Sequence, residues 1–168
     1  MTTPLLPGLP PVVDDRSEVL ILGTFPSAQS LAAQQYYANP RNQFWPITGA
    51  IFGFDAGAPY ESRISALQAH GIALWDVVRQ CRRKGSVDTN IEPNSMVVND
   101  FPAFFAEHPT IHQVYFAIAK AESIYRKRAA IEPHIRYQRL PSTSPANARM
   151  SLEAKLAAWR VLSVASGG

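Results

Sequence analysis

The segment Val19-Leu-Ile-Leu-Gly-Thr-Phe-Pro-Ser27 decides the fold class of this 168-residue chain. Its four consecutive apolar residues, 19–22, show no polar alternation, which indicates a strand covered on both faces, as in a parallel sheet. A glycine turn follows, and Ser27 marks the expected start of a helix. The loop after such a strand lies at the carboxyl edge of the sheet, where open α/β folds bind ligands. We therefore expect a ligand site beside this loop.

Strands and helices are expected to alternate along the whole chain. Further strands are predicted over 72–78, 113–119 and 135–140, and helices over 27–35, 42–52, 60–70, 99–108, 121–130 and 151–162. In the last helix, one face should carry Leu152, Leu156, Trp159 and Leu162. This alternation indicates a parallel α/β sheet. We expect a single domain over 1–168, with a proline-rich lead-in over 1–11 that packs little.

The composition excludes several classes of protein. Hydrophobic residues make up 46% and charged residues 17%, as in an ordinary globular protein. No apolar run approaches the ~20 residues of a membrane span, and the N-terminus lacks the features of a secretion signal. We therefore expect a cytoplasmic protein without a membrane partner. The lone Cys81 and the unpatterned histidines predict no disulfide, no iron–sulfur cluster, no metal site and no cofactor.

Positive charge gathers in the second half of the chain, although the net charge is only +3. The basic residues form two clusters, at 79–84 and 126–128. Such clusters could neutralise DNA phosphates. They could equally be solvated helix ends, where the helix dipole favours cations. Charge alone leaves both interpretations open.

The segment Tyr36-Tyr-Ala-Asn-Pro-Arg-Asn-Gln-Phe-Trp45 has the composition of a pocket wall. A plain surface loop has little use for so many aromatic rings, and a plain core element would not carry the asparagines and the arginine. The mixture indicates a site that stacks a flat group and forms hydrogen bonds at its edge.

These residues resemble the first motif of the uracil-DNA glycosylase superfamily. Gly23 to Ser27 is similar to the Gly-x-x-Pro-Gly/Ser loop of that superfamily. The segment 36–45 resembles the branch that holds the hypoxanthine-DNA (deoxyinosine) glycosylases and the mismatch-specific enzymes. A later segment, Leu140-Pro-Ser-Thr-Ser-Pro-Ala-Asn147, resembles the minor-groove loop. The resemblance spans 19–159 and implies a three-layer α/β/α sandwich with a central, mainly parallel four-stranded sheet.

The resemblance also implies an activity. It is that of a monofunctional DNA glycosylase, which acts on a deaminated base, hypoxanthine first and then uracil, in double-stranded DNA. The enzyme would initiate base excision repair as a monomer. No well-placed lysine nucleophile is found near the first motif, so strand cleavage through a Schiff base is not expected. Two alternatives stay open: a non-catalytic DNA-damage-binding protein of the same fold, and a hydrolase of free nucleosides or nucleotides.

Asn42 is the first candidate for the catalytic group. Breaking the N-glycosidic bond leaves cationic character on the sugar, and a neutral amide can orient a water molecule towards that cation. Members of the superfamily often carry Asp or Asn where Phe25 stands here. The resemblance therefore implies that the asparagine of Pro-Arg-Asn takes this role, with Asn39 as the second candidate. A helix cap is the alternative role of Asn42.

Tyr37 is predicted to stack on the flipped base, because its ring offers a flat apolar face and its hydroxyl can still form a hydrogen bond. A core aromatic is the alternative, and its neighbour Tyr36 is expected to face inward. Ala117-Ile118 stands where relatives carry Asn-Gly, and Leu140 stands where they carry His or Asn. An apolar wall therefore replaces those polar groups. The other predicted base-binding residues are Gly23, Thr24, Phe25, Phe44 and Ala117.

The predicted DNA contacts lie in both motifs. They are Ser27, Arg41, Ser142, Thr143, Ser144, Asn147 and Arg149. Serine hydroxyls and arginines can contact phosphates, and a rigid Ser/Pro-rich loop can wedge into the minor groove. A simple helix cap is an equally good interpretation of Ser27. Asp76 follows an apolar run, and we interpret it as a buried hydrogen-bonding anchor rather than a catalytic carboxylate.

Overall fold

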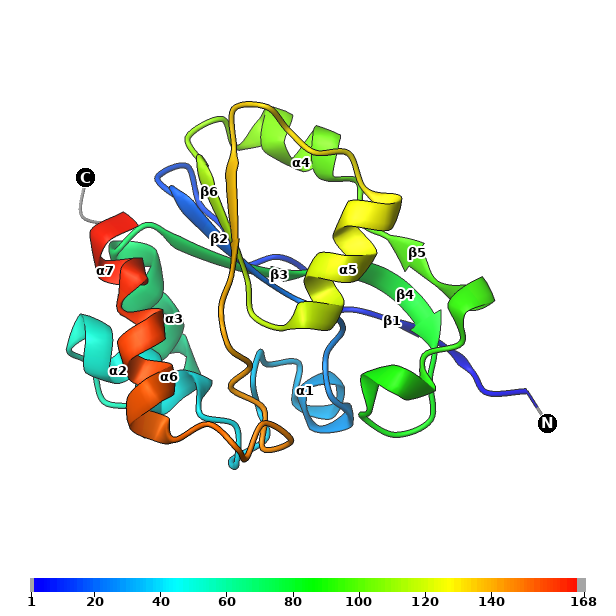
Figure 1. The fold of residues 1–168 in the computed structure, drawn as a ribbon, viewed down its shortest axis with the longest axis horizontal. Helices are drawn as coiled ribbons and strands as arrows, with labels where there is room; N and C mark the ends of the chain where they lie inside the picture. The colour runs from blue at the N-terminus through cyan, green and yellow to red at the C-terminus, as the bar shows by residue number, and fades with distance from the viewer. Residues whose placement is uncertain (1, 166–168) are drawn as a thin grey trace.

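The structure is a computed structural model that describes residues 2–165, and its centre is a four-stranded parallel sheet in the order β3-β2-β6-β7. These strands are β2 (Val19–Gly23), β3 (Ile72–Asp76), β6 (Gln113–Phe116) and β7 (Arg136–Arg139). Each neighbouring pair is parallel, and Figure 1 shows β2, β3 and β6 at the centre of the molecule. All residues of β2 are buried. The prediction of a central parallel sheet around this apolar strand is confirmed.

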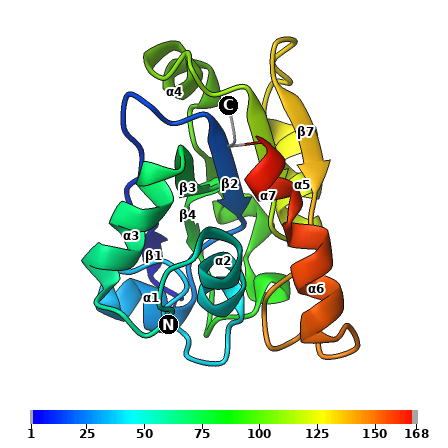
Figure 2. The same ribbon diagram turned by 90° about the vertical axis from the view of Figure 1, so that its left-hand side faces the viewer.

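Helices cover both faces of this sheet and complete the three layers. Side chains of β2 alternate between two hydrophobic clusters, with Val19 and Ile21 in one and Leu20 and Leu22 in the other. The first cluster is closed by α2 (Phe44–Phe52), α3 (Tyr60–Ala69), α6 (Leu152–Trp159) and α7 (Val161–Ala165), which face the viewer in Figure 2. The second cluster is closed by α4 (Phe101–Glu107) and α5 (Ala119–Arg128).

A second, antiparallel sheet was not predicted from the sequence. It has the order β1-β4-β5 and consists of β1 (Leu5–Pro7), β4 (Val78–Arg82) and β5 (Val97–Val98). The strand predicted over 72–78 is therefore two strands, one in each sheet. The expectation that 1–11 packs little is wrong, because β1 pairs with β4 and Leu9 is buried. Pro7 is tolerated there because β1 is an edge strand.

The helix predicted over 151–162 is divided into α6 and α7, which are separated by Arg160. Leu152 does not share the buried face of Trp159 and Leu162, since it is 46% exposed in the first turn of α6. Lys155 is buried in that turn instead, and its ammonium donates to Gln43 Oε1 at 2.7 Å. This bond fixes α6 to the segment that precedes α2.

Short elements connect the sheets and helices. They are α1 (Ala28–Ala33) and the 3₁₀ turns η1 (Asp88–Asn90) and η2 (Pro93–Ser95). The remaining helices, α1 and α5 included, begin and end within two residues of their predicted bounds, and β6 ends at Phe116 rather than at residue 119. Within residues 2–165, no helix combines the length and the apolar character needed to cross a membrane.

Candidate active site

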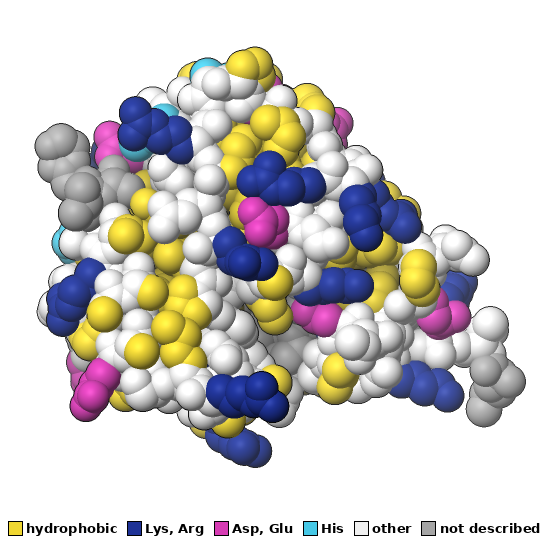
Figure 3. Space-filling model, in the orientation of Figure 1, with side chains coloured by type: hydrophobic (Ala, Val, Ile, Leu, Met, Phe, Trp, Pro, Cys, Tyr) yellow, Lys and Arg dark blue, Asp and Glu magenta, His cyan; other side chains and the backbone are white. Residues whose placement is uncertain are grey.

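A cavity of about 570 Å³ lies at the carboxyl edge of the parallel sheet, as predicted for an open α/β fold. Its walls are segments 23–30 after β2, 36–42 before α2, 86–89 around η1 and 142–146 after β7. The ends of β3 and β6 contribute Asp76 and Ala117. Figure 3 shows this face of the molecule hollowed below its centre, with Lys and Arg side chains on several sides of the hollow.

The first loop is fixed by hydrogen bonds from β3, β4 and the segments beyond them. The carbonyls of Gly23 and Thr24 accept from the amides of Val77 and Val78 at 2.8 and 3.0 Å. The amide of Ala28 donates to Ser86 Oγ at 2.8 Å. Gly23, Thr24 and Phe25 line the cavity, as predicted for base-binding residues. The loop is therefore a rigid wall.

Ser27 begins α1 as a cap and also lines the cavity. Its hydroxyl accepts from the amide of Ser30 at 3.1 Å, so the capping interpretation is confirmed. Among residues 2–165, no partner is found for the amides of Thr24 and Phe25. Those two amides can bind a water molecule or a phosphate oxygen. Contact between Ser27 and DNA stays a prediction.

Tyr37 presents one face of its ring to the cavity. The other face stacks on Phe44, with ring centroids 3.8 Å apart and planes inclined by 14°. Phe44 is fully buried and does not line the cavity, so it supports Tyr37 rather than touching a base as predicted. Tyr37 has a φ of 55°, a left-handed conformation that is unusual for an aromatic residue and is typical of functional sites. Burial raises the pKa of its hydroxyl, which stays protonated.

Tyr36 faces inward, as expected, although it also reaches the cavity wall. Its side chain is 5% exposed and its hydroxyl donates to the carbonyl of Pro10 at 2.8 Å. The carbonyl of Tyr36 accepts from Trp45 Nε1 at 3.2 Å, and its amide donates to the hydroxyl of Tyr60 at 3.0 Å. These bonds fix the backbone from which Tyr37 projects.

Asn42 holds the start of α2 and the second loop together. Its Oδ1 accepts from the amide of Phe44 at 2.9 Å and from Thr143 Oγ1 at 2.8 Å. A backbone amide can only donate, which identifies the facing atom as oxygen. Both lone pairs of Oδ1 are used, and among residues 2–165 Nδ2 of Asn42 has no partner. Asn39 also lines the cavity, but its Oδ1 accepts from the amide of Arg41 at 2.9 Å.

The second loop closes the cavity beside Asn42. Ser142, Thr143 and Ser144 line the cavity, and the carbonyl of Thr143 accepts from the amide of Gln43 at 3.0 Å. Asn147 lies outside the cavity and braces the loop, because its Nδ2 donates to the carbonyl of Ser142 at 2.9 Å. The two motifs, far apart in the sequence, form one wall.

Arg41 and Arg149 also lie outside the cavity and are exposed to solvent. Both belong to the segments that carry the lining residues. Contact of these arginines with DNA phosphates stays a prediction.

Asp76 is a member of the site that the sequence interpretation placed among structural anchors. It is 7% exposed at the end of β3 and lines the cavity. Its Oδ1 would lie 2.6 Å from a β-carbon on Gly23, so the glycine leaves room for the carboxyl group. Burial is the main cause that raises its pKa to about 7, and the nearby charge of Asp88 adds to this shift, whereas Arg83 opposes it.

The uracil DNA glycosylase superfamily model matches residues 10–163, which is most of the chain. The chain belongs to the uracil DNA glycosylase superfamily. A hypoxanthine DNA glycosylase of Methanosarcina barkeri is 35% identical over 158 residues, or 90% of this chain and 94% of the relative. A protein of the same name from Methanosarcina acetivorans is 37% identical over 150 residues, covering 86% and 89%.

A solved structure supports the same membership. The solution NMR structure of a Methanosarcina acetivorans protein, described as a candidate uracil DNA glycosylase, is 34% identical and superposes with a TM-score of 0.76. The match covers 95% of this chain and 99% of that chain. The resemblance inferred from the motifs and the expected three-layer superfamily fold are both confirmed.

The apolar wall expected for this superfamily member is partly present. Ala117 lines the cavity and is 5% exposed, whereas Leu140 is buried outside the cavity. Lys120 of α5 also lines the cavity. Lys120 reaches the cavity because the order of strands in the sheet brings β6 and α5 beside β2. The absence of a lysine nucleophile from the reaction stays a prediction. The segment 86–89 was likewise missed, since its only sequence signal was that of a polar loop.

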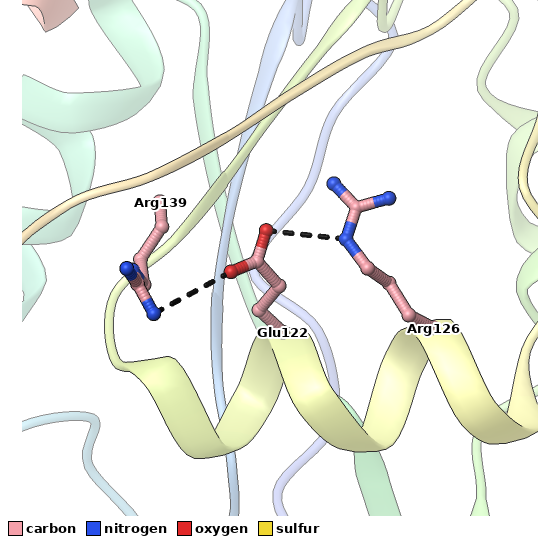
Figure 4. Close-up of polar contacts among 3 residues, drawn as sticks. All are labelled: Glu122, Arg126 and Arg139. Atoms are coloured by element: carbon pink, nitrogen blue, oxygen red, sulfur yellow. Dashed lines mark hydrogen bonds and ion pairs between the residues drawn. The ribbon is translucent and has the colours of Figure 1, made fainter.

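The residues of the two basic clusters differ in their surroundings. Arg83 is 2% exposed and donates through Nη2 to the carbonyl of Pro26 at 2.7 Å, so it fixes the first loop rather than meeting solvent or phosphate. In α5, Arg126 pairs with Glu122 at 3.2 Å, and Arg139 approaches the same carboxylate at 3.7 Å, as Figure 4 shows. Such exposed pairs contribute little to stability. Residues 126–128 end α5, where the helix dipole favours cations.

No cluster of three or more His, Cys, Asp or Glu side chains suited to a metal ion occurs in residues 2–165. Cys81 is buried and unpaired with any other cysteine. The side chains that line the cavity carry amides, hydroxyls, aromatic rings, carboxyl groups and the amine of Lys120.

Proposed function

We propose that this protein is a monofunctional DNA glycosylase that hydrolyses the N-glycosidic bond of hypoxanthine, and secondarily of uracil, in double-stranded DNA. It would initiate base excision repair in the cytoplasm, as a monomer and without a metal or cofactor. The observation that carries the proposal is a cavity that joins the open face of Tyr37 to the fixed amide of Asn42. Similarity to two hypoxanthine DNA glycosylases over most of the chain supports the choice of base.

The cavity suits a base that has left the helix. Its volume of about 570 Å³ falls within the usual range for small-molecule sites. A glycosylase must extrude its target nucleotide into such a pocket, and an aromatic face stabilises the extruded base by stacking. The ring of Tyr37 provides this face, and Phe44 behind it prevents the ring from turning away.

The reaction needs a positioned water molecule at C1′ of the sugar. As the bond between C1′ and the base breaks, its electron pair leaves with the base and C1′ becomes cationic. Asn42 can hold the attacking water through Nδ2, since its oxygen is occupied by Phe44 and Thr143. The amides of Thr24 and Phe25 can hold the same water or the adjoining phosphate. A rigid arrangement of this kind lowers the barrier because little reorganisation is needed.

Incubation of the protein with duplexes that carry deoxyinosine or deoxyuridine tests the proposal. Alkali then reveals the abasic sites, and a sample without alkali shows whether the protein itself cleaves the strand. We expect abasic sites, with deoxyinosine the preferred substrate, and no cleavage before alkali. Cleavage before alkali would contradict the monofunctional assignment and would indicate Lys120 as the candidate nucleophile for a Schiff base. Absence of release from every damaged base, with folded protein in excess, would refute the proposal.

One observation favours a second candidate function, that of a DNA-damage-binding protein without catalysis. Phe25, Ala117 and Leu140 stand where polar groups are common in the superfamily, and the first two line the cavity. Tight binding of damaged duplex with the glycosidic bond intact would support this alternative. Loss of turnover on replacing Asn42 would exclude it.

A further inference from the structure

Asp76 has the surroundings of a reacting group rather than of a structural anchor. Its backbone is held independently of its carboxyl group, because the main-chain carbonyl of Asp76 accepts from Asn99 Nδ2 at 2.8 Å. Within residues 2–165, the buried Oδ2 has no hydrogen-bond partner. An unpaired buried acceptor is unfavourable, and a structural anchor would be expected to satisfy it. The free oxygen belongs to a carboxyl group that lines the cavity.

The carboxyl group lies beside the stacking residue. The hydroxyl of Tyr37 and Asp76 Oδ1 lie 3.8 and 2.6 Å from the point that a β-carbon on Gly23 would occupy. Both polar groups therefore meet at one end of the cavity, at the edge of the ring on which the base is proposed to stack. A base on the open face of Tyr37 would bring its own edge towards Asp76.

The charges around Asp76 favour its neutral form. Asp88 in η1 is a like charge, and the hydroxyls of Tyr36 and Tyr37 are neutral. Among residues 2–165, Arg83 is the one group whose charge lowers the pKa of Asp76. Arg83 is itself engaged with the carbonyls of Pro26 and Gly85. An ionised carboxylate would repel the negative charge that develops on a departing base in the same cavity. A neutral carboxyl group would instead donate a hydrogen bond that strengthens as this charge grows.

We infer that Asp76 is a catalytic residue, whose protonated carboxyl group donates its proton to an acceptor atom of the flipped base as the glycosidic bond breaks. This inference rests on the proposed glycosylase function. The electron pair of the C1′–N bond goes to the base, and the base takes the carboxyl proton and leaves neutral. Water then adds to C1′, and the proton that it releases restores the carboxyl group. The substrates are deaminated bases with an exposed nitrogen or oxygen acceptor.

The test measures the single-turnover rate of hypoxanthine release from a deoxyinosine duplex between about pH 5.5 and about pH 8.5. With a pKa of about 7, the wild-type rate should fall about tenfold per pH unit above neutrality. Asp76→Asn can still donate a hydrogen bond but cannot give a proton to the base, so its rate should be slower than wild type by up to ~10²-fold at acid pH and show no alkaline fall. Asp76→Ala removes the donor and should be slower by ~10²-fold at acid pH.

Asp15→Asn is the matched control, because Asp15 is an exposed aspartate outside the cavity and its replacement is the same chemical change. It should follow the wild-type profile. A wild-type rate that rises with pH, together with an inactive Asp76→Asn protein, would show that Asp76 acts as a carboxylate base and would overturn the inference. Identical profiles of wild type and folded Asp76→Asn would overturn it as well. Both results leave the glycosylase function intact, whereas absence of release by the wild-type protein at every pH overturns the two together.

Discussion

The raised pKa of Asp76 predicts a loss of folding stability at high pH. This loss can be measured without a substrate. The carboxyl group has a pKa of about 7 in the folded protein and about 3.8 when unfolded. Between these values the folded protein keeps a proton that the unfolded chain has released. The free energy of unfolding therefore falls as the pH rises through this window, and the loss is complete above about pH 7.

The size of the loss follows from the shift in pKa. Each pKa unit corresponds to about 1.4 kcal/mol, so the full shift corresponds to about 4 kcal/mol. No reduction for solvent screening applies, because Asp76 is only 7% exposed. Asp76→Asn removes the ionisation without changing the shape of the side chain. Its advantage in stability over wild type should therefore grow from near zero at about pH 4 to about 4 kcal/mol at about pH 8.

Denaturant unfolding, followed by the fluorescence of the three tryptophans, measures this difference at several pH values. Thermal unfolding should report the same trend, as a rise in Tm of roughly 10 °C for Asp76→Asn at about pH 8. Asp15→Asn, an exposed change of equal charge, should match wild type throughout. Equal pH dependence of wild type and Asp76→Asn would refute the reasoning. So would a loss of stability in Asp76→Asn that is confined to high pH, since this would reveal a stabilised carboxylate.

Three further predictions concern the proposed DNA site. Asn42→Asp keeps an oxygen that can accept from Phe44 and Thr143 but removes the Nδ2 donor. Single-turnover release should therefore slow by ~10²–10³-fold while Tm stays near that of wild type. Asn42→Ala should slow release and also lower the free energy of unfolding by about 1 kcal/mol. Full activity in Asn42→Asp would exclude the donor role. Tyr37→Ala should weaken binding of a duplex with a flipped base by about 1–3 kcal/mol in a titration, with a smaller effect on abasic duplex. Binding should weaken steeply with salt, and Arg41→Ala and Arg149→Ala should each reduce the slope of log K against log salt by about one; an unchanged slope would remove those residues from the interface.

The parallel sheet was predictable because its signal is local. Residues 19–22 are buried on both faces of the sheet. A strand in this position needs an unbroken run of apolar residues, and that run can be recognised in the sequence. The antiparallel sheet was not predictable in the same way. β1 and β5 are only three and two residues long, and β1 pairs with residues more than seventy positions away. Short edge strands carry little periodic signal, and their pairing depends on contacts that the sequence does not place.

In the candidate site, too, the residues in contiguous motifs were predictable, and those that depend on the arrangement of strands were not. Tyr37, Asn42 and Ser142–Ser144 lie in two motifs that were recognisable as contiguous segments, and these residues line one cavity. Phe44 was misplaced because it is buried behind Tyr37, and the sequence does not show which of the two rings faces the cavity. Asp76 and Lys120 reach the cavity only because β3 and β6 flank β2. Strand order of this kind has no local signal in the sequence.

The measurement that tests the central claim most directly is the amount of free hypoxanthine that the protein releases from a deoxyinosine duplex. Chromatography of a reaction with protein in excess separates the free base from the DNA, and the abasic sites in the same sample are counted after alkali. The glycosylase assignment predicts one hypoxanthine for each abasic site with wild-type protein, and release slowed by ~10²–10³-fold with Asn42→Asp. Wild-type protein that stays folded and binds the duplex, yet releases no base, would contradict it.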